Sequence, residues 1–326
     1  MNPVLEIENT IALQDEVRDL ARARNAVILA HNYELPEIQS VADYVGDSLG
    51  LSQQAAAAGA DVIAFCGVHF MAETASILSP GKTVLLPDLG AGCSLADSIT
   101  AEQLRQWKAL HPAAVVVMYV NTTAEVKAET DYCVTSANAV RVVEHIYREH
   151  GADTEILFGP DMFLGAYVEK QTGRKMHVWD GECHVHAGIR PRDIGEMRAA
   201  HPGADFLIHP ECGCSTSVME YVAAGDVDPE GVHLLSTGGM LDYARTAVPG
   251  STAIVATETG MLHPLREAAP DVTFLPANRA AVCQFMKMIT LPKLRDALRD
   301  LSPQVKEPAD LAERARLPIE RMVSIK

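Results

Sequence analysis

The segment ADYVGDS, residues 42–48, recurs in altered form as TDYCVTS at residues 130–136, 88 positions further along the chain. In both copies a short apolar run is followed by a serine that opens a helical pattern. A third segment, HLLST at residues 233–237, also places Ser236 and Thr237 ahead of a helical pattern. A repeat of this length is too long for a solenoid unit and fits a small α/β domain. The chain is therefore expected to contain three such units.

Short β-branched runs alternate with amphipathic helical patterns along the chain. This alternation predicts parallel sheets covered by helices on both faces, because strands buried on both sides read as continuous apolar runs. The runs that we expect to form strands are AVILA (26–30), DVIAFC (61–66), TVLLP (83–87), AVVVMYV (114–120), EILFG (155–159), DFLIH (205–209), GVHLL (231–235), TAIVA (252–256) and VTFLP (272–276).

We therefore predict an α/β fold of three similar three-layer αβα domains, whose parallel sheets are arranged around a pseudo-threefold axis. The expected domains are residues 1–108, which include an N-terminal helix, residues 109–197, and residues 198–326, which include a C-terminal helix. In parallel α/β domains, ligands bind beyond the carboxyl ends of the strands. A binding site is thus expected where the three units face one another.

Each unit carries one cysteine at a matched position. The intervals are 45 residues from Ser48 to Cys93, 47 from Ser136 to Cys183 and 47 from Ser236 to Cys283. Taken singly, each cysteine would be assigned to the core, because free cysteine is among the most buried residue types. The matched spacing instead predicts three thiolates around one point, which indicates an iron–sulfur cluster or zinc. Three protein ligands would leave one metal position open to substrate.

Polar side chains close the first strand of each unit, in the segments HNYE, YVN and HPE. Residues two apart in an extended segment face the same side, and such pairs at the end of an apolar strand are expected to point into a cleft. The pairs are His31 with Tyr33, Tyr119 with Asn121, and His209 with Glu211. Lone histidines are more often structural, and His69, His177 and His233 are interpreted in that way.

Ser48, Ser136 and Thr237 each begin a helical pattern. A hydroxyl, the free backbone N–H groups and the helix dipole at such a position together form a cradle for an anion. The alternative is a plain N-cap, which is worth about 1 kcal/mol of stability and carries no function. The two interpretations are compatible.

Composition excludes several classes of function. Of the 326 residues, 48% are hydrophobic and 21% are charged, as in soluble globular proteins, and the net charge of −16 argues against a nucleic-acid surface. No apolar run is long enough to span a membrane. The first 25 residues mix acids and bases at helical spacing, unlike a signal peptide, so we expect a cytoplasmic protein with reduced thiols or metal-bound thiolates.

Several long segments together resemble the quinolinate synthase family. They are AHNYELPEIQSVADYVGDSLGLSQQA, FCGVHFMAETASILSPGKTVLLPDLGAGCSLADS, YVNTTAEVKAETDYCVTSANA, GPDMFLGAYVEKQTGRKMHVWDGECHVH, HPECGC, STGGM and NRAAVCQFMKMITLPKL. The resemblance runs from about residue 26 to residue 295, in order and without a missing block.

The resemblance implies a transferase-type condensing enzyme of three α/β domains around a central cleft. Such an enzyme joins iminosuccinate to dihydroxyacetone phosphate and yields quinolinate, phosphate and two waters for NAD biosynthesis. It also implies a [4Fe–4S] cluster that acts as a Lewis acid, and L-aspartate oxidase as the supplier of iminosuccinate.

The resemblance assigns residues to this site. It places the cluster on Cys93, Cys183 and Cys283, the cysteines that the spacing also selects. Substrate contacts are implied at His31, Ser48, Tyr119, Asn121, Ser136, His184, His209, Glu211 and Thr237. Glu211 and Tyr33 are the candidates for proton transfer, and His209 and His31 are further catalytic candidates.

Other interpretations stay open at this point. Cys183 with His184 could form a nucleophile pair, although no third orienting group is evident nearby. Cys212 and Cys214 could form a second metal site, a redox pair or a regulatory thiol switch, and Lys287 either steadies the charge of a cluster or lies on a solvated face. A cluster-dependent hydro-lyase, a zinc enzyme and a non-catalytic iron–sulfur sensor are the alternative functions.

Overall fold

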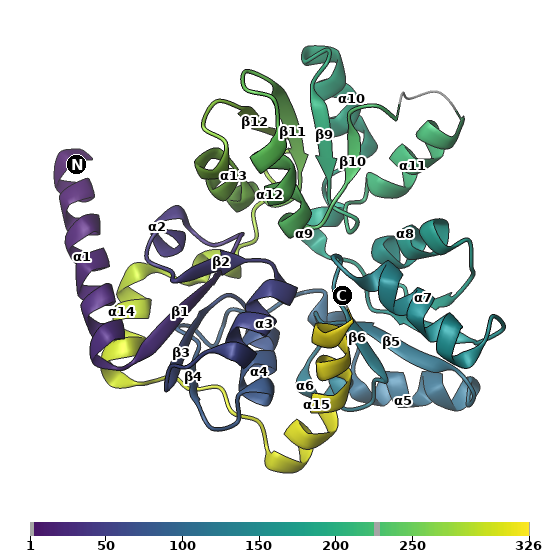
Figure 1. Ribbon diagram of the computed structural model, residues 1–326, viewed down its shortest axis with the longest axis horizontal. Coiled ribbons are helices and arrows are strands. Elements are labelled where there is room, and N and C mark those ends of the chain that lie inside the picture. The colour runs from purple at the N-terminus through teal and green to yellow at the C-terminus, as the bar shows by residue number, and fades with distance from the viewer. Residues whose placement is uncertain (1–2, 225–228, 326) are drawn as a thin grey trace.

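The computed structural model describes residues 3–224 and 229–325, and in these ranges the chain forms three four-stranded parallel sheets (Figure 1). The first sheet has the order β2 (Tyr44–Gly46), β1 (Ala26–His31), β3 (Val62–Cys66) and β4 (Thr83–Leu85). The second has the order β6 (Tyr132–Val134), β5 (Val115–Tyr119), β7 (Ile156–Gly159) and β8 (His177–Val178). The third has the order β10 (Val232–Leu234), β9 (Asp205–Ile208), β11 (Thr252–Ala256) and β12 (Thr273–Pro276).

The three sheets share one topology. In each, the first strand of the unit lies between the second and the third, and the fourth strand forms an edge. The predicted α/β fold with parallel sheets is therefore confirmed. In a sheet of this order, the chain continues to one side of the sheet after the first strand and to the opposite side after the third. Ligands bind in the crevice between these two strands, where the direction reverses.

Helices connect the strands and pack on the sheets. They are α1 (Pro3–Ala23), α2 (Pro36–Gln39), α3 (Ser48–Ala57), α4 (His69–Leu78), α5 (Ala101–Leu110), α6 (Ala124–Lys127), α7 (Ala139–His150), α8 (Met162–Thr172), α9 (His184–Ala187), α10 (Pro191–Ala200), α11 (Ser215–Ala224), α12 (Thr237–Thr246), α13 (Leu262–Ala268), α14 (Leu291–Asp300) and α15 (Ala309–Ser324), with 3₁₀ turns η1 (Ala96–Ser98), η2 (Thr259–Met261) and η3 (Met286–Met288). Among the described residues, no helix combines the length and the apolarity that crossing a membrane requires.

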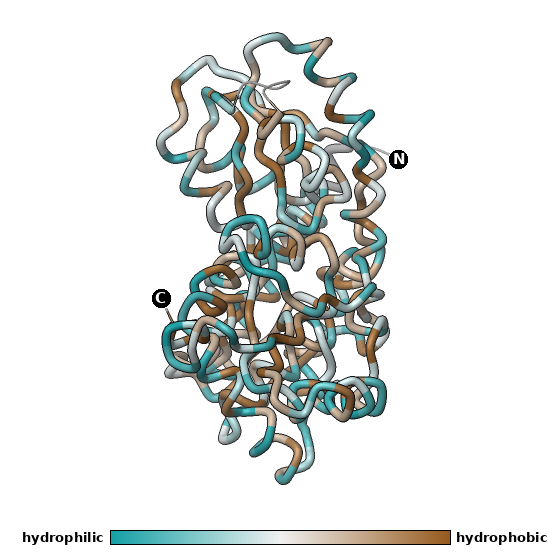
Figure 2. Tube along the Cα trace, turned by 90° about the vertical axis from the view of Figure 1, so that its right-hand side faces the viewer, coloured by the Kyte–Doolittle hydropathy of each residue, from teal (hydrophilic) through white to brown (hydrophobic). Residues whose placement is uncertain are grey.

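The strands supply the buried interior. Every residue of β3 is buried, as are those of β7, which explains their continuous apolar sequence. Figure 2 shows apolar segments running through the inside of the molecule and hydrophilic segments along many of the outer loops.

The C-terminal segment returns to the first two units. Helix α14 packs against α1 and β3, and Figure 1 shows α14 beside α1. Helix α15 packs against β6 and α6 of the second sheet's unit and against α4 of the first. The Nδ2 of Asn138 donates to the carbonyl of Met322 at 2.9 Å, and the Met322 side chain is fully buried. This helix thus fixes the first two units against each other on the side away from the third sheet.

Candidate active site

A cavity with an empty volume of about 700 Å³ lies at the carboxyl ends of strands from all three sheets. It brings together every residue that the sequence predicted for the site. These are His31, Tyr33, Ser48, Cys93, Tyr119, Asn121, Ser136, Cys183, His184, His209, Glu211, Thr237 and Cys283. The structure thus places at one point side chains that are as far as 252 positions apart in the sequence.

The alternation of side chains after the first strands follows the prediction. His31 and Tyr33 both line the cavity, with ring centroids 4.5 Å apart, whereas Asn32 points away and donates from Nδ2 to the Thr237 hydroxyl at 3.0 Å. In the other two units Val120 and Pro210 are likewise absent from the lining, and the polar residues on either side of each belong to it.

Each of the three matched cysteines begins a short helical turn. Backbone N–H groups of that turn point at the sulfur of the cysteine that begins it. The groups belong to the residues two and three positions later: Leu95 and Ala96 for Cys93, Val185 and His186 for Cys183, and Phe285 and Met286 for Cys283. Such N–H groups favour the charged thiolate, as they do for other anions at the start of a helical turn. The same arrangement of N–H groups occurs at all three cysteines, and the sequence intervals between the cysteines did not predict it.

Burial opposes ionisation of these thiols. It raises the pKa of Cys93 to about 12 and raises the pKa values of Cys183 and Cys283 as well. The nearby Cys283 further raises the pKa of Cys93, which shows that the thiols are close enough to repel one another as anions. A buried group of this kind becomes ionised when a metal supplies positive charge.

The three sulfurs are spread more widely than the ligands of a single ion. Within the described part of the chain they do not form a group whose atoms all lie within 4.8 Å of one another, whereas Cys183, His186 and Glu211 do. A single tetrahedral zinc ion, with Zn–S bonds of about 2.3 Å, would hold its sulfurs about 3.8 Å apart. As they are placed here, the three sulfurs therefore do not form the ligand set of a single zinc ion.

Buried carboxyl groups contact the backbone N–H of two of the three matched cysteines. The Oε1 of Glu258 accepts from the backbone N–H of Cys283 at 3.0 Å and pairs with the Nζ of Lys287 at 3.1 Å. Asp161 caps α8 and lies opposite the backbone N–H of Cys183. Burial raises the pKa of Asp161 to about 7 and also raises the pKa of Glu258. Lys287 is thus a partner of a buried carboxyl group, and the interpretation as a solvated face is wrong.

The loop that leads into Cys183 passes close to Pro160 and Ser98 at Gly181. A Cβ atom at this position would lie 2.5 Å from the carbonyl oxygen of Pro160 and 2.6 Å from the Oγ of Ser98. Any side chain here would push the loop away from the cavity. The glycine that precedes Cys183 is therefore required by close approach of the backbone.

A buried polar network joins the three units around Glu211. The hydroxyl of Tyr119 donates to Glu211, and Nδ1 of His186 lies 3.4 Å from its Oε2. The Nε2 of His186 lies 3.2 Å from the hydroxyl of Tyr33, which also contacts Thr257 at 2.6 Å. His186 therefore lies between Tyr33 and Glu211, with a contact to Tyr33 and a buried Nδ1 that has no hydrogen-bond partner.

Burial favours the neutral forms of the titratable groups in and around this network. Burial lowers the pKa of His31 to about 3 and that of His186 to about 4, and it lowers the pKa of His209 well below its usual range. Burial also raises the pKa of Glu211 well above that of an exposed carboxyl group. Each neutral imidazole has both a donor and an acceptor nitrogen, so these histidines can accept or donate a hydrogen bond to a substrate group.

The helix-start hydroxyls line the cavity but are not the caps of their helices. Ser48 and Thr237 are the first residues of α3 and α12, and the caps are Asp47, which accepts from Gly50 N–H at 2.8 Å, and Ser236. Ser136 precedes the first residue of α7 by three positions. The plain N-cap interpretation is therefore wrong for these residues. Their position leaves the hydroxyls available to a ligand.

Residues outside the first prediction also contribute. Ser94, which follows Cys93, contacts Nδ1 of the predicted residue His184 through its Oγ at 2.6 Å and thereby joins two units. The carboxyl of Asp47 lies against the start of α12, where a Cβ at Gly238 would be 2.9 Å from its Oδ2. These contacts between units depend on the assembled fold, and no local sequence signal marks them.

The other cysteines and histidines lie away from this chemistry. Cys66 and Cys133 are buried in β3 and β6, as expected. Cys212 and Cys214 form a disulfide with each other and are fully buried, so the expectation of reduced or metal-bound cysteines is wrong for this pair. The three histidines interpreted as structural each face a carboxylate outside the cavity: His69 faces Glu73, His177 faces Glu155 and His233 faces Asp205.

Comparison with known proteins identifies the family. The family model described as quinolinate synthetase A protein matches residues 15–324. A quinolinate synthase of Mycobacterium sp. (strain KMS) is 57% identical over 311 residues, which cover 95% of this chain and 91% of the relative. The quinolinate synthase of Mycobacterium tuberculosis (strain ATCC 25618 / H37Rv) is 56% identical over 311 residues, which cover 95% of this chain and 88% of the relative.

The lowered pKa of His31 predicts a pH-dependent loss of stability. An unfolded imidazole titrates near 6.5 and the folded one near 3, so the unfolded chain alone takes up this proton as the pH falls below 6.5. In this range His31 should reduce the free energy of unfolding by about 1.4 kcal/mol per pH unit. In His31→Gln the slope measured by urea unfolding should be shallower by about this amount. His150→Gln, at an exposed site, should leave the slope unchanged; equal slopes for wild type and His31→Gln would contradict the assignment.

Proposed function

The chain belongs to the quinolinate synthetase A family, and we propose that it condenses iminosuccinate with dihydroxyacetone phosphate to give quinolinate, phosphate and two waters. The observation that carries this proposal is the single cavity in which three matched cysteines, three helix-start hydroxyls and the Glu211 network meet. Joining the fragments requires a carbon nucleophile, loss of phosphate, imine formation and dehydration. Each of these needs proton transfer or stabilisation of an anion.

A [4Fe–4S] cluster on Cys93, Cys183 and Cys283 is part of the proposal. The wide spacing of the sulfurs and the paired N–H groups at each one support a multinuclear group. When bound, such a cluster supplies a Lewis acid, because an iron without a protein ligand can polarise a substrate oxygen. Glu258 and Asp161 would hold the backbones of Cys283 and Cys183 in place.

Glu211 and Tyr33 are proposed to move protons. The enamine form of iminosuccinate is the carbon nucleophile, and its formation requires a base and an acid within reach of the substrate. Burial raises the pKa of Glu211 above that of an exposed carboxyl group, which suits it to hold a proton and release it during the reaction. His186 lies between Glu211 and Tyr33: its Nε2 contacts the hydroxyl of Tyr33, and its Nδ1 is 3.4 Å from Oε2 of Glu211 without a hydrogen bond. A small movement on substrate binding is proposed to complete this connection.

The substrates carry two carboxylates and one phosphate, and the cavity is built to hold such anions without fixed positive charge. Among the described residues that line it there is no lysine or arginine. The hydroxyls of Ser48, Ser136 and Thr237, with the N–H groups at the starts of α3 and α12, are proposed to bind these groups. His31, His209, His184, Tyr119 and Asn121 complete the proposed substrate contacts.

The reaction is proposed to take place in the cytoplasm, as part of NAD biosynthesis. Iminosuccinate hydrolyses in water as imines do, so a nearby L-aspartate oxidase is proposed to supply it. The net charge of −16 supports small-molecule partners over nucleic acid.

Replacement of Cys183 by Ser is expected to abolish quinolinate formation from iminosuccinate and dihydroxyacetone phosphate. The serine hydroxyl is a much poorer ligand for iron, so the iron content of the anaerobically purified protein should fall with the activity while the circular dichroism stays unchanged. Cys133→Ala, at a buried cysteine outside the cavity, should keep both iron and activity. A Cys183→Ser variant with full turnover would overturn the proposal, and turnover without dihydroxyacetone phosphate would indicate a hydro-lyase.

Glu211→Gln is expected to lower kcat by about 10²- to 10⁴-fold, because the amide cannot exchange a proton near neutral pH. The iron content should stay at the wild-type level, since Glu211 is not a proposed cluster ligand. Steady-state assays with both substrates give kcat and KM separately. The matched control is Glu196→Gln on the exposed face of α10, which should leave both unchanged. A Glu211→Gln variant with wild-type kcat would remove Glu211 from the chemistry.

A further inference from the structure

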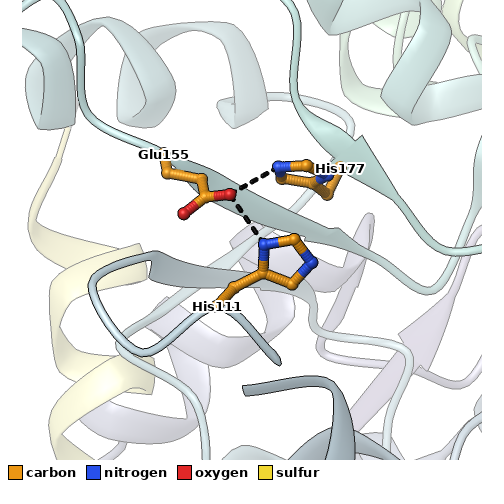
Figure 3. A group of neighbouring side chains, drawn as sticks. All are labelled: His111, Glu155 and His177. Carbon is orange, nitrogen blue, oxygen red and sulfur yellow. Dashed lines mark hydrogen bonds and ion pairs between the residues drawn. The ribbon is translucent and has the colours of Figure 1, made fainter. Parts of the chain in front are cut away.

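A second cluster of ligand-type side chains lies at the opposite end of the second sheet. Glu155 immediately precedes β7, His177 is the first residue of β8, and His111 follows α5 shortly before β5 (Figure 3). Because the strands are parallel, their amino ends meet at one edge, and the active-site cavity lies beyond the other. The cluster is therefore separate from the proposed reaction.

The two imidazoles converge on one carboxylate oxygen. The Nδ1 of His111 and the Nε2 of His177 each lie 2.7 Å from Oε1 of Glu155, and Figure 3 shows both rings pointing at it. The two rings also contact each other, with centroids 4.2 Å apart. All three ligand atoms lie within 4.8 Å of one another. Two nitrogens and one oxygen from three separate segments thus face a common point.

The chemistry of this group is that of a zinc ligand set. Neutral imidazole and carboxylate bind Zn²⁺ at about 2.0–2.2 Å, which places neighbouring ligand atoms about 3.3 Å apart. Opening the present contacts by about half an ångström would make room for the ion at that spacing.

The cluster is open to an incoming ion and to water. The side chains of His111, Glu155 and His177 are 23%, 38% and 45% exposed. Three protein ligands leave a fourth position for water in a tetrahedral arrangement. Partly exposed side chains on three different segments can shift together without disturbing the buried strands behind them.

We propose that His111, Glu155 and His177 form a structural site for a divalent transition metal of the Zn²⁺ class. The strand that it would hold, β8, is only two residues long and lies at the edge of the sheet. Six residues after His177 the same segment reaches Cys183, and on the way Trp179 Nε1 donates to the carbonyl of Ser98 at 3.1 Å. An ion at His177 would fix the start of the segment that carries Cys183 into the cavity.

Zinc binding to the anaerobically purified, iron-loaded protein tests this site. After removal of adventitious metal with a weak chelator, dialysis against Zn²⁺ followed by metal analysis should give one zinc per chain. Affinity should fall at least tenfold in His177→Ala and in Glu155→Gln, the second of which keeps a hydrogen-bonding side chain of the same size. The control is His263→Ala, whose histidine faces a single glutamate within α13. It should bind zinc as the wild type does.

A thermal measurement adds a second readout. Zinc should raise the Tm of the wild type and of His263→Ala, and should leave the Tm of His177→Ala and Glu155→Gln unchanged. Zinc uptake should also persist in Cys183→Ser, which separates this site from the cavity. No zinc uptake by the wild type, equal uptake by all variants, or loss of uptake in Cys183→Ser alone would overturn the proposal. None of these outcomes depends on the proposed reaction.

Discussion

Three thiols and three carboxyl groups, those of Asp47, Glu211 and Glu258, share one cavity whose described lining contains no lysine or arginine, and this electrostatic constraint shapes the site. Burial raises the pKa values of all three thiols and of Glu211, so the protein by itself favours their neutral forms. Backbone N–H groups at each sulfur partly compensate, but they supply only partial charges. In the proposed function, a metal group on the thiols supplies the positive charge that stabilises them as thiolates.

The fold provides this convergence through repetition. Each sheet has the same strand order, so each unit presents a first-strand end and a cysteine loop beyond the fourth strand to the same cavity. The units nevertheless differ in the residue that stands two positions after the third strand. Glu258 and Asp161 face the backbone of Cys283 and Cys183, whereas the corresponding position before Cys93 is the apolar Val68. The backbones of Cys183 and Cys283 are therefore held by a carboxyl group from this position, whereas the backbone of Cys93 is not.

Much of this arrangement was predictable from sequence. All of the predicted strands exist, because buried parallel strands leave continuous apolar runs, and the matched intervals selected three cysteines that line one cavity. The strands β2 and β6 were missed because each has only three residues with a polar residue on either side, whereas an apolar run extends beyond the end of the equally short β4 and β10. The strand β8 was missed because it has only two residues. The roles of His186, Glu258 and Asp161 were missed because each depends on a contact with another segment. The alternative interpretation of Ser48 and Thr237 as plain N-caps is wrong by one residue, since Asp47 and Ser236 accept the capping hydrogen bonds.

The central claim is that the three matched cysteines hold one iron–sulfur cluster. Iron and acid-labile sulfide should be measured in wild-type protein purified without oxygen, together with its visible spectrum. The account predicts about four irons and four sulfides per chain and a broad brown absorbance. A colourless protein that contains only zinc or no metal at the cysteines, even after anaerobic reconstitution with iron and sulfide, would contradict it.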